Sequence, residues 1–219
     1  MKLSRNLNFK LRRYFSNQRL LTSDFIHNRL YAKNDGYFSK KDVQLGLLEE
    51  PIEFSSLLGY EDYQKILVER YPKNAWLTPS EIFKPWYGMT IGNYINDCWK
   101  NYQSNDQMLR DKRLKIIEVG AGNGSAASSI LNYFKLISPN LYNSLEYKII
   151  EISPIMIERC RKNLSKDHPN LIKKRNIKFI NQSIVDYKAQ DNDIVFILFL
   201  EVLDNMPHDR VYIVNFIIK

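Results

Sequence analysis

Residues 114–124 read Leu114-Lys115-Ile116-Ile117-Glu118-Val119-Gly120-Ala121-Gly122-Asn123-Gly124, and this stretch decides the fold. An apolar run ends at an acid, three glycines follow at alternate positions, and the small residues of 125–129 begin a helical pattern. The order predicts a strand, a tight turn and a helix N-terminus, where α/β proteins hold nucleotide-like ligands. Glycine suits such a turn because it adopts positive φ and lets a ligand approach bare backbone. The alternative is a structural turn without a ligand, although a turn alone needs one glycine rather than three.

The glycine spacing narrows the class of ligand. A dinucleotide fingerprint requires G-x-G-x-x-G, but Ser125 stands where that pattern has its third glycine. No Gly-Lys-Ser/Thr sequence follows to make a phosphate-binding loop. The pattern E-x-G-x-G-x-G instead resembles the first motif of class I S-adenosylmethionine (SAM) methyltransferases. The resemblance implies SAM as cofactor, with its amino-acid end against Gly120, Gly122 and Gly124.

Strands alternate with helices from residue 114 onward. In chain order, the predicted strands are 114–119, 147–152, 177–180 and 194–200, and the predicted helices are 123–137 and about 155–164. This alternation predicts an α/β fold with a doubly wound, mostly parallel sheet. The nearly continuous apolar run at 194–200 predicts a central strand buried on both faces. Ser153 and Pro154 are expected at the N-cap and first position of the second helix.

The chain before this alternation has a helical pattern. Residues 60–71 predict one helix. Thr78 is expected to cap the next helix, with Glu81 completing a capping box. Apolar residues three or four apart between 83 and 99 predict an amphipathic helix that covers the sheet, with a kink at Pro85 and Gly88. We therefore expect an N-terminal helical extension at 21–113 and a Rossmann-like, SAM-binding domain at 114–219, its sheet incomplete.

Acidic and amide side chains follow the predicted strands. Glu151 ends the second strand, where a carboxylate can accept hydrogen bonds from ribose hydroxyls; a capping acid is the alternative. Glu118 is expected either to accept from backbone donors in the glycine turn or to lie near the sulfonium of SAM. Gln182 follows the third strand, where many methyltransferases have an aspartate near the adenine, and an amide can also bond the adenine edge.

Two further carboxylates follow the fourth strand and are the candidate catalytic residues. Glu201 and Asp204 are three positions apart, so a helical segment would point them to the same side. A pair of carboxylates matches the planar donor fork of a guanidinium and could help to remove its proton. The alternative is a pair of helix-capping acids.

The positive charge of the chain is concentrated at its N-terminus. Of 32 basic residues, six lie within residues 1–20, which contain no acid; the rest of the chain has 26 basic residues against 24 acidic ones. An arginine-rich, acid-free, amphipathic start is typical of a mitochondrial transit peptide, so we expect residues 1–20 to direct import into the matrix. A basic arm for nucleic acid or anionic lipid is the alternative. The nearly neutral remainder gives a nucleic-acid partner little support.

Cysteine, histidine and hydropathy patterns exclude several other classes. Cys98 and Cys160 are far apart in the sequence and there are only three histidines, so we expect packed thiols, no disulfide framework and no metal site. No apolar run approaches the roughly 18 residues of a membrane span.

A finer resemblance rests on several motifs in order. They are Asn34-Asp35-Gly36-Tyr37-Phe38, Thr78-Pro79-Ser80-Glu81-Ile82, Tyr87-Gly88-Met89-Thr90-Ile91-Gly92, Glu118-Val119-Gly120-Ala121-Gly122-Asn123-Gly124, Glu151-Ile152-Ser153-Pro154 and Glu201-Val202-Leu203-Asp204-Asn205-Met206-Pro207. Over about residues 25–210 the chain resembles the MidA-like methyltransferases, the mitochondrial complex I assembly factor group. The resemblance implies a protein substrate, arginine methylation and a role in complex I assembly.

Two departures from that family matter. Leu200 stands where the family has an asparagine before the acid equivalent to Glu201. Family members are also about twice as long, so we expect a truncated product with an apolar tail at 211–218 and doubtful activity. A non-enzymatic assembly chaperone on the same fold is therefore a second hypothesis, and a nucleic-acid methyltransferase is a third.

Overall fold

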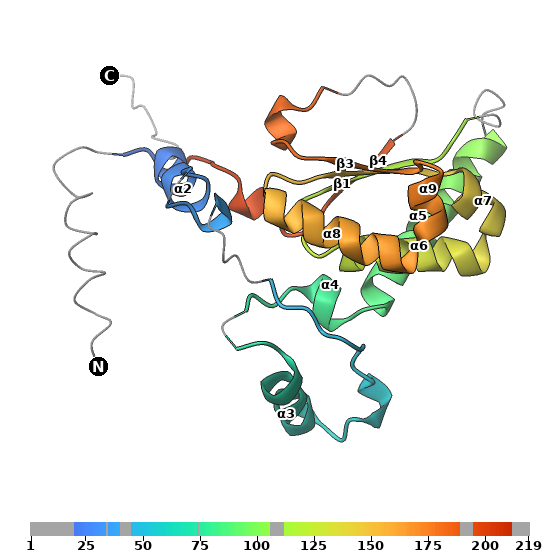
Figure 1. Ribbon diagram of the computed structural model, residues 1–219, viewed down its shortest axis with the longest axis horizontal. Helices are drawn as coiled ribbons and strands as arrows, with labels where there is room; N and C mark the ends of the chain where they lie inside the picture. The colour runs from blue at the N-terminus through green and yellow to red at the C-terminus, as the bar shows by residue number, and fades with distance from the viewer. Residues whose placement is uncertain are drawn as a thin grey trace, which may run out of the picture. The chain divides into compact units, whose positions relative to one another are not determined.

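The computed structural model describes residues 20–33, 35–39, 45–73, 75–105, 112–188 and 195–211 (Figure 1). The chain divides into two compact units. The larger unit is Lys41–Asp204, and the smaller unit combines Met1–Lys40 with Asn205–Lys219. The larger unit contains the sheet and the residues predicted to bind SAM.

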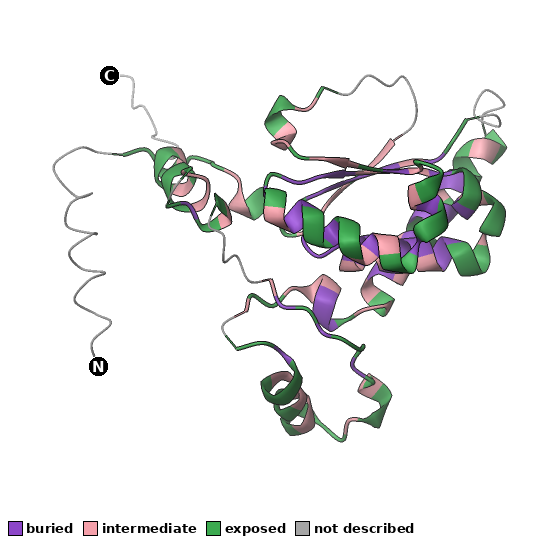
Figure 2. Ribbon diagram, viewed as in Figure 1, coloured by how far each residue is buried: buried purple, intermediate pink, exposed green. Residues whose placement is uncertain are grey.

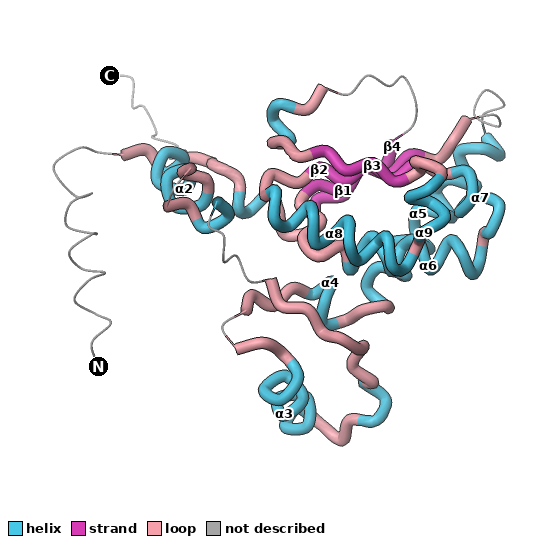
Figure 3. Tube along the Cα trace, in the orientation of Figure 1, coloured by secondary structure: helices cyan, strands magenta, loops and turns pink. Residues whose placement is uncertain are grey.

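A parallel sheet of four strands forms the centre of the larger unit (Figure 3). Its strands are β1 (Lys115–Val119), β2 (Glu146–Ile150), β3 (Ile177–Ile180) and β4 (Val195–Phe199), in the spatial order β3-β2-β1-β4. Every neighbouring pair is parallel. The α/β fold with a parallel sheet is thus confirmed, and each strand lies within two residues of its predicted position.

Helices connect the first three strands. They are α6 (Ser125–Ile137) and α7 (Pro139–Ser144) between β1 and β2, then α8 (Pro154–Asp167) and α9 (Pro169–Lys173) between β2 and β3. The predicted cap of α8 is confirmed, because Ser153 Oγ accepts from the backbone N–H of Met156 at 3.4 Å and Pro154 is the first helical residue.

The main core lies between the sheet and the helices, where buried residues line the facing surfaces (Figure 2). It joins Ile116 and Ile149 of the sheet to Phe134 of α6 and Leu164 of α8. A smaller cluster covers the opposite face, where Ile117 and its neighbours pack against residues 184–202. Alternate side chains of β1 therefore serve two separate cores, as the period of two in a strand requires.

The strand order places a reversal of direction beside β1. The chain proceeds from β1 through β2 to β3 on one side, and β4 then pairs with the other side of β1. In open α/β sheets the crevice at such a switch point, beyond the carboxyl ends of the strands, is where ligands bind. The site is therefore expected between the ends of β1 and β4.

The predicted burial of β4 on both faces is wrong for the described residues. β4 borders the four-stranded sheet, and its side chains are half-buried or exposed, with Ile197 54% exposed. The apolar run at 194–200 predicts a central strand, but no described strand pairs with the outer side of β4. A hydrophobic run fits a border strand as well as a central one, so hydrophobicity alone does not distinguish the two.

The helical extension contains α3 (Tyr60–Arg70), α4 (Pro79–Ile82) and α5 (Trp86–Asn105). At Pro85 the predicted kink is a full break between α4 and α5, with a cis peptide bond at Lys84–Pro85. At Gly88 the predicted kink is wrong, because this residue lies inside the uninterrupted α5. α5 packs along α6, and its Ile95 and Trp99 enter the main core. Thr78 and Pro79 stand at the predicted N-cap and first position of α4. The predicted capping box is wrong, because the Thr78 side chain makes no cap bond and the buried Glu81 carboxylate joins a tertiary network.

The smaller unit contains α2 (Thr22–Leu30) and two contacts between distant parts of the chain. Asp209 accepts hydrogen bonds from the backbone N–H and hydroxyl of Ser23, and the Tyr31 hydroxyl donates to the carbonyl of Asn205. The predicted transit peptide at 1–20, apart from Leu20, and the tail after Val211 lie outside the described residues. Among the described helices, none has the length and apolar character to cross a membrane.

Candidate functional site

All four strands point the same way, so their carboxyl ends meet at one edge of the sheet. The glycine turn follows β1, Glu151 follows β2, Gln182 lies just after β3, and Glu201 lies just after β4. The predicted residues are therefore brought to the same edge, as the sequence alternation required.

The turn between β1 and α6 uses positive φ at all three glycines. The φ values are 68° at Gly120, 57° at Gly122 and 82° at Gly124, a region that other residues rarely adopt. The Gly120 N–H donates to the Ile150 carbonyl at 2.8 Å, and the Gly124 N–H donates to the Ala121 carbonyl at 2.8 Å. The first bond holds the turn against the end of β2, and the second closes the turn itself.

Each glycine of the turn also allows a close approach by another element. A Cβ on Gly120 would lie 2.8 Å from a methyl carbon of Val202, and one on Gly124 would lie 2.8 Å from Cys160 Sγ. A Cβ on Gly122 would lie 2.9 Å from Leu45 Cδ1. Val202 brings the segment after β4 to the turn, in agreement with the switch point between β1 and β4.

Glu151 lies next to the glycine turn. Its carboxylate accepts from the backbone N–H of Ser153 at 2.9 Å, and the backbone N–H groups of Gly122 and Ile152 are close enough to lower its pKa. The side chain is 7% exposed, and burial raises its pKa although these donors oppose the shift. A carboxylate has about four acceptor sites, so capacity remains for a hydroxyl.

Glu118 lies behind the turn and is 2% exposed. It accepts from the Tyr147 hydroxyl at 2.6 Å, and burial raises its pKa to about 7, with a further contribution from the charge of Glu151. Burial also raises the pKa of Cys160, a free thiol, and the charges of Glu118 and Glu151 raise it further. Glu118 is therefore a deeply placed acid whose hydrogen-bond donor is a tyrosine of β2.

The amides after β3 take different positions. Asn181 Nδ2 donates to the carbonyls of Glu151 and Ile152 at 2.8 and 3.1 Å, so it ties the end of β3 to the Glu151 loop. Gln182 is half-buried beside it, and its backbone N–H donates to the Ile180 carbonyl. Its role at the adenine stays a prediction.

The predicted helical spacing of Glu201 and Asp204 is wrong in detail. A 3₁₀ turn begins only at Leu203, and Glu201 precedes it in the left-handed region at φ 54°. Both side chains are exposed, and burial together with the charge of Asp204 raises the pKa of Glu201. The two carboxylates are thus electrostatic neighbours after β4, although a bend rather than a helix brings them together.

A model of the family described as "Putative S-adenosyl-L-methionine-dependent methyltransferase" matches residues 90–215. The chain belongs to this methyltransferase family. The match begins within α5 and includes the sheet, the glycine turn and the carboxylates after β4. The curated proteins contain no match.

Solved structures of similar fold come from Burkholderia thailandensis. A superfamily member described as a "likely methyl transferase", bound to S-adenosyl-homocysteine (SAH), is 17% identical with a TM-score of 0.50, over 84% of this chain and 38% of its own. A native structure of the same superfamily is 18% identical with a TM-score of 0.49, over 92% of this chain and 39% of its own. This chain thus spans less than two fifths of either structure, and the first likeness supports the fold.

The residues at the strand edge fit the cofactor of the family. The turn presents bare backbone at Gly122, where, among the described residues, a Cβ would meet only a methyl group of Leu45 within 4 Å. Glu151 lies next to that turn and retains acceptor capacity for a sugar hydroxyl. A nucleoside with an amino-acid arm could therefore bridge these two groups.

Sequence reasoning missed Leu45, Asn123 and Val202 as neighbours of the glycine turn. Asn123 Nδ2 donates to the Gly46 carbonyl at 2.9 Å, a contact across a large sequence separation. Nothing local in residues 45–48 indicates that they lie beside the turn. An asparagine within a glycine motif was the one available signal, because its amide must find partners when buried.

Proposed function

We propose that this methyltransferase chain binds SAM on the glycine turn, with Glu151 accepting hydrogen bonds from the ribose hydroxyls. One observation carries the proposal: the Gly122 N–H is close enough to the Glu151 carboxylate to lower its pKa, so the two groups form one surface. The turn supplies bare backbone to the amino-acid arm, and its N–H groups open the helix α6. Glu118 adds negative charge behind the turn when it is ionised.

We propose further that the methyl acceptor is a guanidinium nitrogen of an arginine in a protein. Bound SAM supplies an electrophilic methyl group on a sulfonium. Glu201 and Asp204 then bind the planar N–H fork and orient one nitrogen toward that carbon. As the new N–C bond forms and the S–C bond breaks, one carboxylate accepts the proton that the nitrogen loses. The proximity of the two carboxylates after β4 supports this assignment.

The finer assignment is to the MidA-like, mitochondrial branch of the family, with a subunit of respiratory complex I as the protein substrate. The motif order from Asn34 to Pro207 and the acid-free, basic residues 1–20 support it. A fusion of residues 1–30 to a fluorescent reporter is expected to enter the matrix. A reporter that stays cytosolic would remove the mitochondrial part of the proposal.

Cofactor binding is tested by isothermal titration of the full chain with SAM and with SAH. We expect saturable binding of both, and loss of both in Gly122→Val, because a branched side chain at φ 57° beside Leu45 is strained and blocks the turn. A folded wild-type chain that binds neither ligand would refute the proposal.

Transfer is tested with SAM carrying a labelled methyl group and an arginine-containing peptide or protein extract. Glu201→Gln is expected to keep SAH affinity and lose label transfer, because the residue acts on the acceptor rather than on the cofactor. A non-catalytic assembly protein, the second candidate, predicts SAH binding without transfer in the wild-type chain. Label appearing on lysine or nucleic acid instead would contradict the arginine assignment.

A further inference from the structure

The segment Leu45–Leu48 runs beside the glycine turn, although it lies far from it in the sequence. Leu45 Cδ1 would be 2.9 Å from a Cβ on Gly122, the glycine whose backbone is proposed to meet the cofactor. Among the described residues, no atom outside the turn other than this methyl carbon lies within 4 Å of that Cβ position. Leu45 thus touches one border of the face of Gly122.

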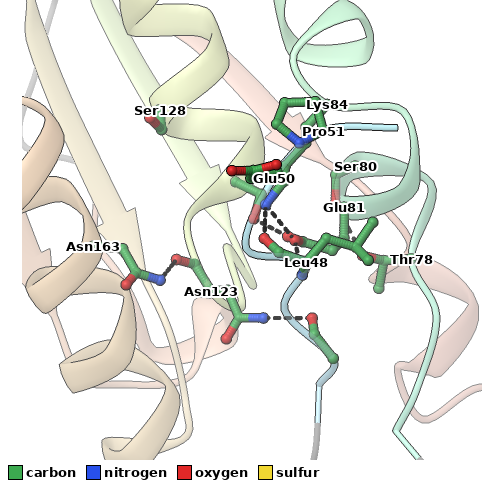
Figure 4. A network of polar contacts seen from close by, with 12 residues as sticks. Leu48, Glu50, Pro51, Thr78, Ser80, Glu81, Lys84, Asn123, Ser128 and Asn163 are labelled. Carbon is green, nitrogen blue, oxygen red and sulfur yellow. Dashed lines mark hydrogen bonds and ion pairs between the residues drawn. The ribbon is translucent and has the colours of Figure 1, made fainter. Parts of the chain in front are cut away.

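A first polar connection joins the segment to the turn (Figure 4). Asn123, which lies between Gly122 and Gly124, donates through Nδ2 to the Gly46 carbonyl at 2.9 Å. Its own backbone carbonyl accepts from Asn163 Nδ2 of α8, also at 2.9 Å. Asn123 is buried, so losing either partner would leave a buried polar group unsatisfied.

A second connection passes through Glu81 of α4, which is 1% exposed (Figure 4). Its Oε1 accepts from the Leu48 N–H and from Lys84 Nζ, both at 2.6 Å. Its Oε2 accepts from the hydroxyl of Ser125, the first residue of α6. Lys84 Nζ also donates to the Leu48 carbonyl. One buried carboxylate therefore joins the segment, α4 and the helix that follows the glycine turn.

The side of the segment away from the turn is fixed as well. The Gly46 N–H donates to the Trp76 carbonyl at 3.2 Å, and the Tyr71 hydroxyl donates to the same carbonyl at 2.5 Å. A Cβ on Gly46 would lie 2.0 Å from the Tyr71 ring, so the backbone passes directly against that ring. Contacts on both sides hold Leu45 at a defined position rather than leaving it to fluctuate.

We propose that Leu45 is a cofactor-contacting residue, an apolar wall beside the part of SAM that lies on Gly122, and that Glu81 and Asn123 are positioning residues for it. This inference rests on the proposed binding of SAM at the turn. The isobutyl group excludes water from that side of the ligand and supplies dispersion contacts. The carboxylate and the amide act only through the segment and the turn that they join.

Titration of the full chain with SAH tests the wall. Leu45→Ala is expected to weaken SAH binding by about ten- to fiftyfold, because the three side-chain carbons that it removes lose their contact with the ligand. Leu47→Ala is the matched control: the same change, two residues away, at an exposed side chain. It should bind SAH as the wild type does.

The outcomes separate this inference from the proposed function. If the wild-type chain does not bind SAH, the proposed function fails. If it binds and Leu45→Ala binds equally well, the wall is refuted alone. Tighter binding by Leu45→Ala also refutes it, because Leu45 would then occupy space that the ligand needs.

A double-mutant cycle tests the positioning role of Glu81. Glu81→Gln should weaken SAH binding several-fold in the wild-type background and have little effect in Leu45→Ala, since it acts through Leu45. Glu49→Gln, an exposed carboxylate in the same stretch, is the control. If thermal melts show that Glu81→Gln does not fold, Ser125→Ala removes one donor to Glu81 and serves in the same cycle. Additive effects on affinity would overturn the positioning role.

Discussion

The backbone N–H of Gly122 lies close enough to the carboxylate of Glu151 to lower its pKa, so the turn after β1 and the acid after β2 are neighbours. A nucleoside with an amino-acid arm could therefore contact both groups at once. Glu151 is already buried, and the backbone N–H of Ser153 orients its carboxylate before any ligand binds.

Glu151→Gln should therefore weaken SAH binding by about ten- to a hundredfold, the range for hydrogen bonds to a charged group. Glutamine keeps the shape but replaces one acceptor oxygen with a donor, which cannot accept from a ribose hydroxyl. Titration with SAH and with adenosine measures the effect. The loss should be similar for both ligands, because they share the ribose.

The control for this change is Glu158→Gln, an exposed carboxylate on α8 whose partner is Arg161. It should leave both affinities unchanged. If Glu151→Gln lowers SAH affinity but not adenosine affinity, the carboxylate serves the amino-acid arm and the ribose assignment is wrong.

Gly124→Ala should destabilise the chain by about 2–4 kcal/mol. The new methyl would lie 2.8 Å from Cys160 Sγ, an overpacking cost of about 1–3 kcal/mol, and φ 82° adds the cost of a left-handed alanine. Urea unfolding measures the change. Adding Cys160→Ala should recover the overpacking part but not the backbone part.

Gly59→Ala is the matched glycine control, because a Cβ there meets no described residue within 4 Å and the backbone is extended. Its effect should stay within about 1 kcal/mol, the usual loss on placing alanine at an N-cap. Equal destabilisation by the two variants would show that the close packing of the turn on α8 contributes nothing.

The strands, the glycine turn and the cap of α8 could be predicted because their signals are local. The apolar run and the spacing of Gly120, Gly122 and Gly124 specify a strand and its turn within a short stretch. Ser153 followed by Pro154 likewise specifies a helix start. In a parallel sheet these local elements determine which ends meet, so the placement of Glu151 followed from them.

Long-range contacts could not be predicted in the same way. Glu81 has the spacing of a capping box, but its carboxylate gains more donors from Leu48, Lys84 and Ser125 than from the backbone of its own helix. The bend at Glu201 was also missed, because a positive φ at a non-glycine residue leaves no sequence signal. Tertiary partners decided both positions.

The pH dependence of stability should contain a contribution from Glu118. Burial raises the pKa of its carboxyl from 4.5 to about 7, so the folded state favours the protonated form. This contribution is fully present below the unfolded pKa and is lost as the pH rises through about 7. At about 1.4 kcal/mol per pKa unit, the full change is on the order of 3 kcal/mol.

Urea unfolding at several pH values between 4.5 and 8 tests this, with the difference between wild type and Glu118→Gln as the quantity followed. Two other groups contribute to the pH dependence. Burial lowers the pKa of His168, whose contribution to stability is lost as the pH falls below 6.5. Burial raises the pKa of Glu151, as it does that of Glu118. Both remain in the variant and cancel. Tyr147→Phe should move the loss to higher pH, because the hydroxyl that favours the ionised form is removed. A difference independent of pH would contradict the assignment.

Replacing Glu201 by glycine should maintain or raise the stability of the chain while it abolishes methyl transfer, because Glu201 has a left-handed backbone conformation. A non-glycine residue at φ 54° costs about 1–2 kcal/mol relative to glycine, part of which glycine returns through the flexibility of the unfolded chain. Glu201→Gly should therefore leave the free energy of unfolding unchanged or raise it by up to about 1 kcal/mol, while methyl transfer is lost. Arg175→Gly, at φ 59°, should show the same stability change without loss of transfer. Destabilisation by Glu201→Gly alone would mean that this side chain holds the fold together, and the interpretation of its strained backbone as a functional feature would be wrong.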